Sequence, residues 1–187
     1  MTGGGQSLRS RTAVQLAHTS QLDADLLRIV RALLDEVFGA DMDERAWDHA
    51  LGGMHAIVWE AAEVVAHGAV VQRRLLHERV SLRTGYVESV AVRPDRRGCG
   101  HGAAVMDALE RVIQAAYQVG ALRASEIGAG FYRHRGWRQW LGRTWALTAS
   151  GPVRTADEDQ SVHVLDPAGL LDVARDLTCD WREGDVW

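Results

Sequence analysis

The 187-residue sequence carries a formal net charge of −4, and 47% of its residues are hydrophobic. Such a length fits one domain with a substantial core, and no apolar run approaches the roughly 20 residues that span a bilayer. The acidic balance disfavours general nucleic-acid binding, which needs a clustered positive surface, but suits a cationic substrate. We therefore expect a single domain over residues 12–187 after a flexible terminus over residues 1–11, with neither nucleic acid nor membrane as a partner.

The cysteines and histidines disfavour two further classes of site. Cys99 and Cys179 lie far apart, and the eight histidines show no metal-binding spacing, so neither a disulfide framework nor a metal site is expected. A nucleophilic role for Cys99 is disfavoured because no histidine is placed by sequence to activate it. The first residues lack the basic segment and apolar core of a secretory signal, which indicates a cytoplasmic location.

The first part of the chain is predicted to hold three strands and two helices. Ser20 begins a Ser-Gln-Leu-Asp capping pattern before an apolar-periodic stretch, and Asp43 is placed to cap a shorter helix. The predicted strands cover 12–16, 55–59 and 64–72, and the predicted helices cover 20–38 and 43–50. An antiparallel meander that continues into the next strand is the simplest arrangement.

The next strand runs into a turn rich in arginine and glycine, which opens a long helix. Side chains alternate in a β-like pattern from Gly85 to Val92, and Pro94 with Asp95 ends the strand. From Gly102 onward, apolar residues recur at helical spacing. The turn therefore lies between a predicted strand and a predicted helix, which fix its two ends.

The composition of this turn favours binding of an anion. Its glycines have no Cβ, so backbone N–H groups can approach a ligand closely; they are Gly98, Gly100 and Gly102. Arg93, Arg96 and Arg97 add positive charge in a geometry that suits phosphate. A tight turn without a ligand is the alternative. No Gly-Lys-Ser/Thr is present, which excludes a P-loop nucleotidase, and no acid follows where a dinucleotide-binding fold needs one.

The remainder of the chain alternates short strands with a short helix. We predict a strand over 121–125 beside the strand that precedes the turn, a helix over 129–135, and short strands over 137–140, 145–148, 162–165 and after residue 172. This order predicts a mixed α/β fold of the α+β type.

The spacing Arg97-x-x-Gly100-x-Gly102 after a strand resembles the pyrophosphate-binding signature of the GNAT acetyltransferase superfamily, which grips coenzyme A. The resemblance implies the GNAT acyl-CoA N-acyltransferase fold, with a mostly antiparallel central sheet flanked by helices. It also implies a bulge in the strand over 85–92 that leaves backbone N–H groups near Val90 and Val92 free. The residues expected to bind acetyl-coenzyme A, the co-substrate, are Val90, Ala91, Val92, Arg93, Arg97, Gly98, Cys99, Gly100, His101 and Gly102.

Two residues are candidates for proton transfer. Glu88 lies just before the turn, close to where an amine would attack a carbonyl held near Val90, and is therefore the candidate base; the alternative is a solvated or salt-bridged strand glutamate. Tyr132 lies in Phe-Tyr-Arg-His-Arg-Gly-Trp. The GNAT resemblance implies that it protonates the leaving thiolate, whereas the residues alone favour an aromatic packed under a helix.

Four further stretches resemble the aminoglycoside 2'-N-acetyltransferases. They are His49-Ala-Leu-Gly-Gly-Met-His55, Gly85-Tyr-Val-Glu88, Tyr117-Gln-Val-Gly120 and the terminal Cys179-Asp-Trp-Arg-Glu-Gly-Asp-Val-Trp187. This resemblance implies direct acetyl transfer to the 2'-amino group in a ternary complex, a role in antibiotic resistance, and a homodimer. Arg123 is a departure from this family near the expected substrate; it would repel a cation unless an acid such as Glu126 neutralised it.

Aminoglycosides carry several ammonium groups, so a binder needs acids spread over a concave surface. The expected substrate-binding residues are Asp41, Glu88, Ser89, Asp157, Glu158, Asp185 and Trp187, the last through its carboxylate or against a sugar face. For each acid taken singly, a solvated charge is the alternative. Two other functions stay open: acetylation of another polyamine or an arylamine, and a non-catalytic module that binds coenzyme A and a cation.

Overall fold

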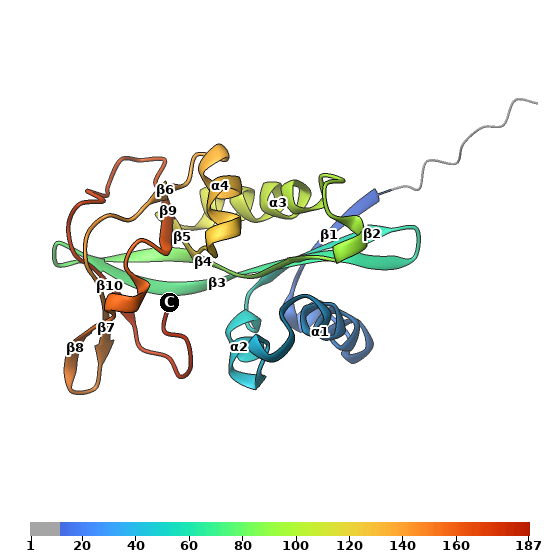
Figure 1. Cartoon of the computed structure of the whole chain (residues 1–187), viewed down its shortest axis with the longest axis horizontal. Helices are drawn as coiled ribbons and strands as arrows, with labels where there is room; N and C mark the ends of the chain where they lie inside the picture. Colours follow the sequence, from blue (N-terminus) through green and yellow to red (C-terminus); the bar gives the residue numbers. More distant parts are fainter. Residues whose placement is uncertain (1–11) are drawn as a thin grey trace, which may run out of the picture.

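The computed structural model of the chain describes residues 12–187 (Figure 1). The expected flexible terminus, residues 1–11, lies outside the described residues. The helices are α1 (Ala24–Phe38), α2 (Glu44–Ala50), α3 (His101–Ala116) and α4 (Glu126–His134). The strands are β1 (Thr12–His18), β2 (Met54–Glu60), β3 (Glu63–His77), β4 (Val80–Val92), β5 (Val119–Arg123), β6 (Arg138–Gln139), β7 (Thr144–Thr148), β8 (Gly151–Arg154), β9 (Val162–Leu165) and β10 (Leu177–Asp180).

The described strands form one mixed sheet that is mostly antiparallel. β1 to β4 make the predicted antiparallel meander, and β4 pairs in parallel with β5, as predicted for the strand beside the turn. From β6 the order runs β6-β9-β5-β4-β3-β10-β7-β8, while β1 and β2 branch from β3. The predicted α/β fold with a flanked central sheet is confirmed.

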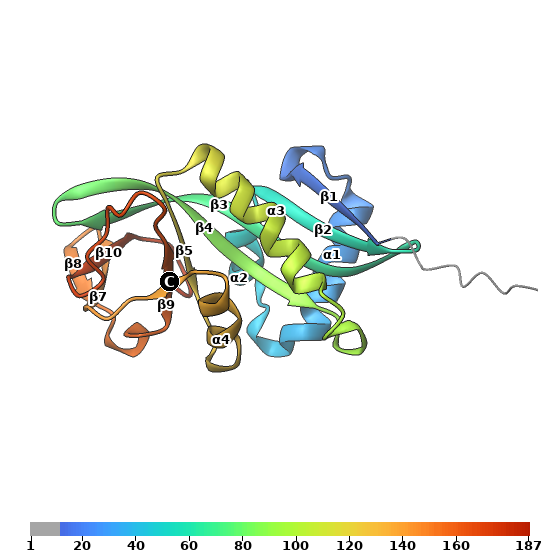
Figure 2. The ribbon, with the colours of Figure 1, turned by 90° about the horizontal axis from the view of Figure 1, so that it is seen from above.

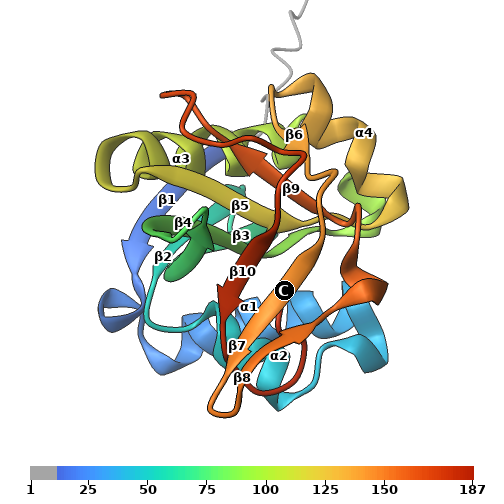
Figure 3. The same cartoon turned by 90° about the vertical axis from the view of Figure 1, so that its left-hand side faces the viewer.

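Helices cover both faces of the sheet. α3 and α4 lie on one face and α1 and α2 on the other (Figure 1). α3 buries an apolar stripe that includes Val105, Leu109 and Ile113 against β2 to β4, and α1 buries Val30, Leu33 and Leu34 on the opposite face. A third cluster fills the end formed by β7, β9 and β10, where the C-terminus lies (Figure 3). Among the described helices, none is both long and apolar enough to cross a membrane.

One local prediction was wrong, and one strand was missed. Asp23, not Ser20, caps α1: its carboxylate accepts the N–H of Leu26 at 2.8 Å, whereas Ser20 lies in a short 3-10 turn after β1. β8 was not predicted because Gly151 and Pro152 favour a turn, yet the segment pairs with β7 at the end of the sheet order, where proline is tolerated.

Candidate active site

A β-bulge in β4 is the centre of the site. Glu88 pairs with Ala69, and Ala91 pairs with His67. Between these two pairs β4 contains one residue more than β3. The backbone strain of the bulge lies at Ser89, whose φ of +52° is uncommon for a residue with a side chain. The bulge that the GNAT resemblance implied is therefore present.

The neighbouring strand β5 separates from β4 just before the bulge. β5 pairs with β4 only from Thr84 to Tyr86, and Figure 2 shows the two strands running apart beyond this point. Because Arg93 donates its N–H to Val65 on β3 at 2.9 Å, the alternation of a strand directs the N–H groups of Val90 and Val92 toward the opposite, open edge.

The turn after β4 presents a row of free backbone donors. Gly98 and Gly100 have φ of +76° and +86°, which favours glycine. Ala104 donates to the carbonyl of Gly100 at 3.0 Å, but no N–H from residues 98 to 103 has an acceptor among the described hydrogen bonds. Unpaired donors at the positive end of the α3 dipole suit a phosphate.

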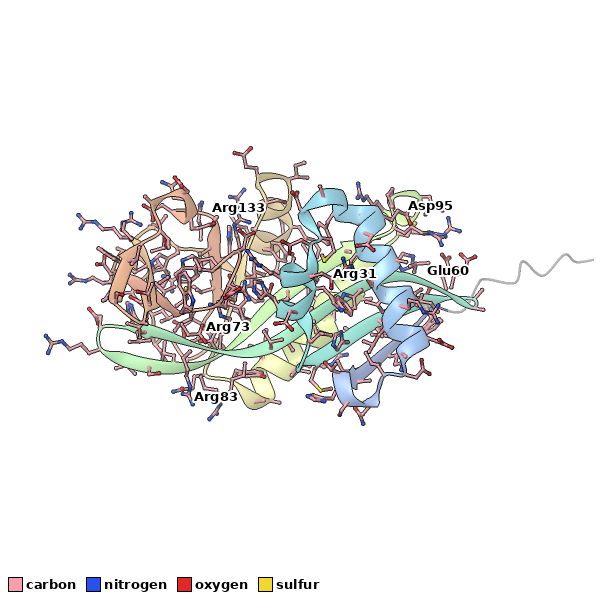
Figure 4. The ribbon with its side chains drawn as sticks, turned by 90° about the horizontal axis from the view of Figure 1, so that it is seen from below. Arg31, Glu60, Arg73, Arg83, Asp95 and Arg133 are labelled. Carbon is pink, nitrogen blue, oxygen red and sulfur yellow. The ribbon has the colours of Figure 1, made fainter. Side chains whose placement is uncertain are left out.

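The three arginines of the turn differ in their partners. Arg93 is held by Glu63 at 2.8 Å and Asp95 at 2.7 Å, and Arg96 bridges Glu60 and Asp95, both at 2.8 Å, at the end of the sheet seen in Figure 4. Nearby carboxylates therefore already engage the Arg93 side chain in this structure, which favours Arg97 as the side chain that grips the cofactor.

Arg97 is the turn arginine without a carboxylate partner in the described ion pairs; its Nε lies 3.4 Å from the carbonyl of Val92. Cys99 is exposed beside it. The His101 side chain is only 5% exposed, with Nε2 3.9 Å from a Glu60 carboxylate oxygen, so its backbone N–H is the group left to bind a ligand. The turn thus offers one guanidinium without a carboxylate partner in the described ion pairs and a run of N–H groups.

Glu88 lies on the face of β4 that α2 and the chain's end cover. Its side chain is 13% exposed and forms an ion pair with Arg182 Nη1. Burial raises the pKa of Glu88, while the Arg182 guanidinium opposes this rise. Beneath it, the Tyr86 ring lies under the guanidinium groups of Arg73 at 4.7 Å and Arg182 at 5.4 Å. Glu88 is therefore a salt-bridged strand glutamate in this structure, which was the alternative to a base. It also has the buried position that a base would need.

Two of the expected substrate acids meet at one arginine. Arg123 binds Glu158 at 2.6 Å and Asp185 at 3.4 Å. These two acids, rather than Glu126, neutralise Arg123. Asp41 and Asp157 are exposed on separate 3-10 turns, Gly39–Asp41 and Ala156–Glu158, without an ion pair among the described contacts. The structure thus brings Glu158 and Asp185 together at Arg123, whereas Asp157, next to Glu158 in the same turn, and Asp41 do not share this arginine in the described ion pairs.

The indole of Trp187 is buried rather than open to a ligand. The residue is 2% exposed, and its indole N–H donates to the Thr155 hydroxyl at 2.9 Å. The indole therefore packs in the core beside β7 and β10 and presents no face to a sugar. Sequence alone did not reveal this, because a terminal aromatic residue is equally compatible with stacking on a ligand.

Tyr132 projects from α4 into the core under α3. It is 9% exposed, and burial raises its pKa to about 12. Its neighbour Phe131 lies near Gly102: a Cβ on that glycine would come 3.8 Å from the Phe131 ring. α4 therefore flanks the start of α3, on the side toward which β5 diverges.

Two residues around the site were missed by the sequence analysis. Arg182 lies within the recognised terminal motif, and its signal was a lone cation among acids. His67 is fully buried, bonds the carbonyl of Ser89 at 3.1 Å and contacts His55 at 2.9 Å. Its signal was a histidine inside an apolar strand.

A bulged strand, a diverging neighbour and a glycine-arginine turn at a helix start define the acetyl-transferring enzymes of the GNAT class. A family model described as Acetyltransferase (GNAT) domain matches residues 18–140. An aminoglycoside 2'-N-acetyltransferase of Mycolicibacterium fortuitum is 49% identical over 177 residues, covering 92% of this chain and 91% of the relative. The chain belongs to the GNAT acetyltransferase family and, within it, to the aminoglycoside 2'-N-acetyltransferases.

Solved structures share the fold at lower identity. The Escherichia coli GNAT protein YhbS, solved in complex with CoA, has a TM-score of 0.65 at 15% identity, covering 97% of this chain and 94% of that one. Escherichia coli ElaA has a TM-score of 0.61 at 18% identity, covering 83% and 100%.

Proposed function

We propose that this protein transfers the acetyl group of acetyl-coenzyme A to the 2'-amino group of aminoglycosides and thereby confers resistance to them. The observation that carries the proposal is the 49% identity to an aminoglycoside 2'-N-acetyltransferase along more than nine-tenths of both chains. The buried carboxylate at the bulge and the adjacent free donors fit this chemistry.

The residues of the turn fit the co-substrate. The free N–H groups of residues 98 to 103 and the Arg97 guanidinium would hold the pyrophosphate of acetyl-coenzyme A. The N–H groups of Val90 and Val92 would bind the pantetheine arm and acetyl carbonyl along the open edge of β4. A phosphate needs several donors at once, and this turn offers them without competing acceptors among the described residues.

Glu88 and Tyr132 would move the two protons. An amine attacks only when deprotonated, and a carboxylate whose pKa is raised by burial is a better base than an exposed one. With a pKa of about 12, Tyr132 keeps its proton at neutral pH and can give it to the leaving sulfur. Direct attack uses no cysteine nucleophile, so both substrates must be bound together.

The acids would bind the remaining ammonium groups. Asp41, Asp157, Glu158 and Asp185 provide carboxylates, and Ser89 contributes backbone polar groups at the bulge. Trp187 would contribute its carboxylate, and its buried indole would anchor Asp185, two residues earlier. The homodimer implied by the family resemblance also stays a proposal, and sedimentation or light scattering of the pure protein tests it.

Release of thiol from acetyl-coenzyme A in the presence of tobramycin tests the proposed function. Turnover with tobramycin that exceeds turnover with spermidine supports it. Faster turnover with spermidine or an arylamine favours the broader N-acetyltransferase. No release with any aminoglycoside, despite binding of coenzyme A, favours a non-catalytic binding module.

A further inference from the structure

The C-terminal segment forms a strap over the candidate base. We use "strap" for residues 181–187, which follow β10. Along the strap, Arg182 pairs with Glu88 and Asp185 pairs with Arg123, while the carbonyl of Glu183 bonds the His49 imidazole on α2 at 2.8 Å. The strap therefore places a guanidinium beside the Glu88 carboxylate of β4 and a carboxylate beside the Arg123 guanidinium of β5.

The guanidinium of Arg182 is held firmly in this place. Its side chain is 15% exposed, its Nε donates to the carbonyl of Asp185 at 2.7 Å, and its Cζ lies 5.4 Å from the Tyr86 ring centroid. Cation–π contact and a charge-assisted hydrogen bond both favour this position. The strap is anchored beyond Arg182 by the buried Trp187.

A base must lie within hydrogen-bond distance of the ammonium group that it deprotonates. Glu88 is largely buried, so few directions of approach to its carboxylate remain, and Arg182 fills one of them. Two cations at one carboxylate repel each other in a site of low dielectric. An arriving ammonium group must therefore displace the guanidinium or bind against its charge.

We propose that Arg182 occupies the position of the substrate ammonium at Glu88 in the free enzyme, so that it competes with amine substrates and selects those with enough positive charge to replace it. This inference rests on the function proposed above, because it assumes that Glu88 acts on an amine. Arg182 is a positioning residue: it holds the carboxylate ionised and oriented until an amine arrives.

Several charged and titratable groups around Glu88 influence its pKa. They are Arg182 and Asp185 of the strap, His49 of α2, Arg73 of β3, Tyr86 of β4, Arg123 of β5, and Asp180 of β10, which pairs with Arg73. Of these, Arg182 is the partner in direct ion pair with Glu88. Its removal should raise the pKa of Glu88 further, because the guanidinium would no longer oppose the effect of burial.

The variant Arg182→Gln tests the proposal. We expect the KM for tobramycin to fall about tenfold, and the acid limb of the kcat/KM profile to move to higher pH, because a base with a raised pKa loses its proton later. Arg182→Lys, which keeps the charge, should retain a KM near that of the wild type. Arg45→Gln is the matched control: it removes the same charge from α2, where Arg45 faces Glu183 of the strap at 3.9 Å with its side chain 63% exposed.

A KM and an acid limb for Arg182→Gln that match those of Arg45→Gln would overturn the inference, as would a raised KM. If Arg182→Gln does not fold, NMR of the wild-type protein tests the inference instead. The ¹⁵N signal of Arg182 Nε should shift when tobramycin is added without acetyl-coenzyme A. An unshifted signal at saturating tobramycin overturns the inference. Absence of turnover by the wild type on every amine would instead refute the proposed function itself.

Discussion

The imidazole of His67 and the carbonyl oxygen of Ser89 are 3.1 Å apart, which ties β3 to the residue that carries the strain of the bulge. A carbonyl only accepts, so His67 Nδ1 must carry the proton. His67 Nε2 then accepts from His55 Nδ1 at 2.9 Å, and His55 Nε2 accepts from the Thr19 hydroxyl at 2.8 Å. The chain of bonds runs in one direction, from the turn after β1 to the bulge beside Glu88.

Removal of this chain should loosen the bulge. His67→Leu leaves the Ser89 carbonyl and the His55 N–H without partners, and we expect a loss of about 1–3 kcal/mol in the free energy of unfolding together with a lower kcat. His67→Gln can donate to one partner and accept from the other, so it should lose less. Urea denaturation measures both variants. Equal stability of the two would show that the hydrogen bonds to the bulge matter little.

The same pair of histidines should make stability depend on pH. Burial lowers the pKa of His55 to about 4 and of His67 to about 3. The unfolded chain therefore takes up protons below about pH 6.5 while the folded chain does not. Stability should fall as the pH drops from 6.5 to about 4, by up to about 1.4 kcal/mol per pH unit for each histidine. The double variant His55→Gln/His67→Gln should have a shallower slope over this range, and an unchanged slope would assign the dependence to other groups.

The two flanking arginines of the turn should behave differently. Arg97→Gln removes the guanidinium without a carboxylate partner and should raise the KM for acetyl-coenzyme A about tenfold, since a charge-assisted contact to phosphate is lost. Arg93→Gln is the matched control, because its side chain is engaged by Glu63 and Asp95. It should leave that KM within about twofold. A larger effect at Arg93 than at Arg97 would reverse the assignment.

The proposed acid and base should act on turnover rather than on binding. Glu88→Gln and Tyr132→Phe keep the shape of each side chain, and each should lower kcat by about 10²- to 10⁴-fold. Tyr117→Phe is the control for loss of a tyrosine hydroxyl, since Tyr117 is half-buried at the end of α3, away from the turn. Thiol release at saturating substrates gives all three values. Wild-type kcat in both Glu88→Gln and Tyr132→Phe would reject both roles.

Local sequence was enough to predict the strand and the turn, because their signals lie within eighteen consecutive residues, and the family resemblance implied the bulge. The partners of the turn were not predictable in this way. Arg93 and Arg97 carry the same charge four residues apart. Arg93 is engaged by Asp95 and also by Glu63, thirty residues earlier on a neighbouring strand, whereas Arg97 has no carboxylate partner among the described ion pairs.

The chain's end illustrates the same limit. Its motif was recognised, but the pairing of Arg182 with Glu88 joins residues 94 positions apart, and the burial of Trp187 depends on Thr155 and the surrounding strands. Composition showed that acids and cations were present in the tail. Only the packing of the strap against β4, β5 and α2 determines which of them meet.

The most direct measurement compares two aminoglycosides that differ in the acceptor atom alone. Kanamycin B carries an amino group at the 2' position and kanamycin A a hydroxyl. With acetyl-coenzyme A and the pure protein, we expect kanamycin B to gain one acetyl group, placed on the 2' nitrogen by NMR, and kanamycin A to remain unmodified. Equal acetylation of both, or acetyl transfer to another nitrogen of kanamycin B, would contradict the proposed function.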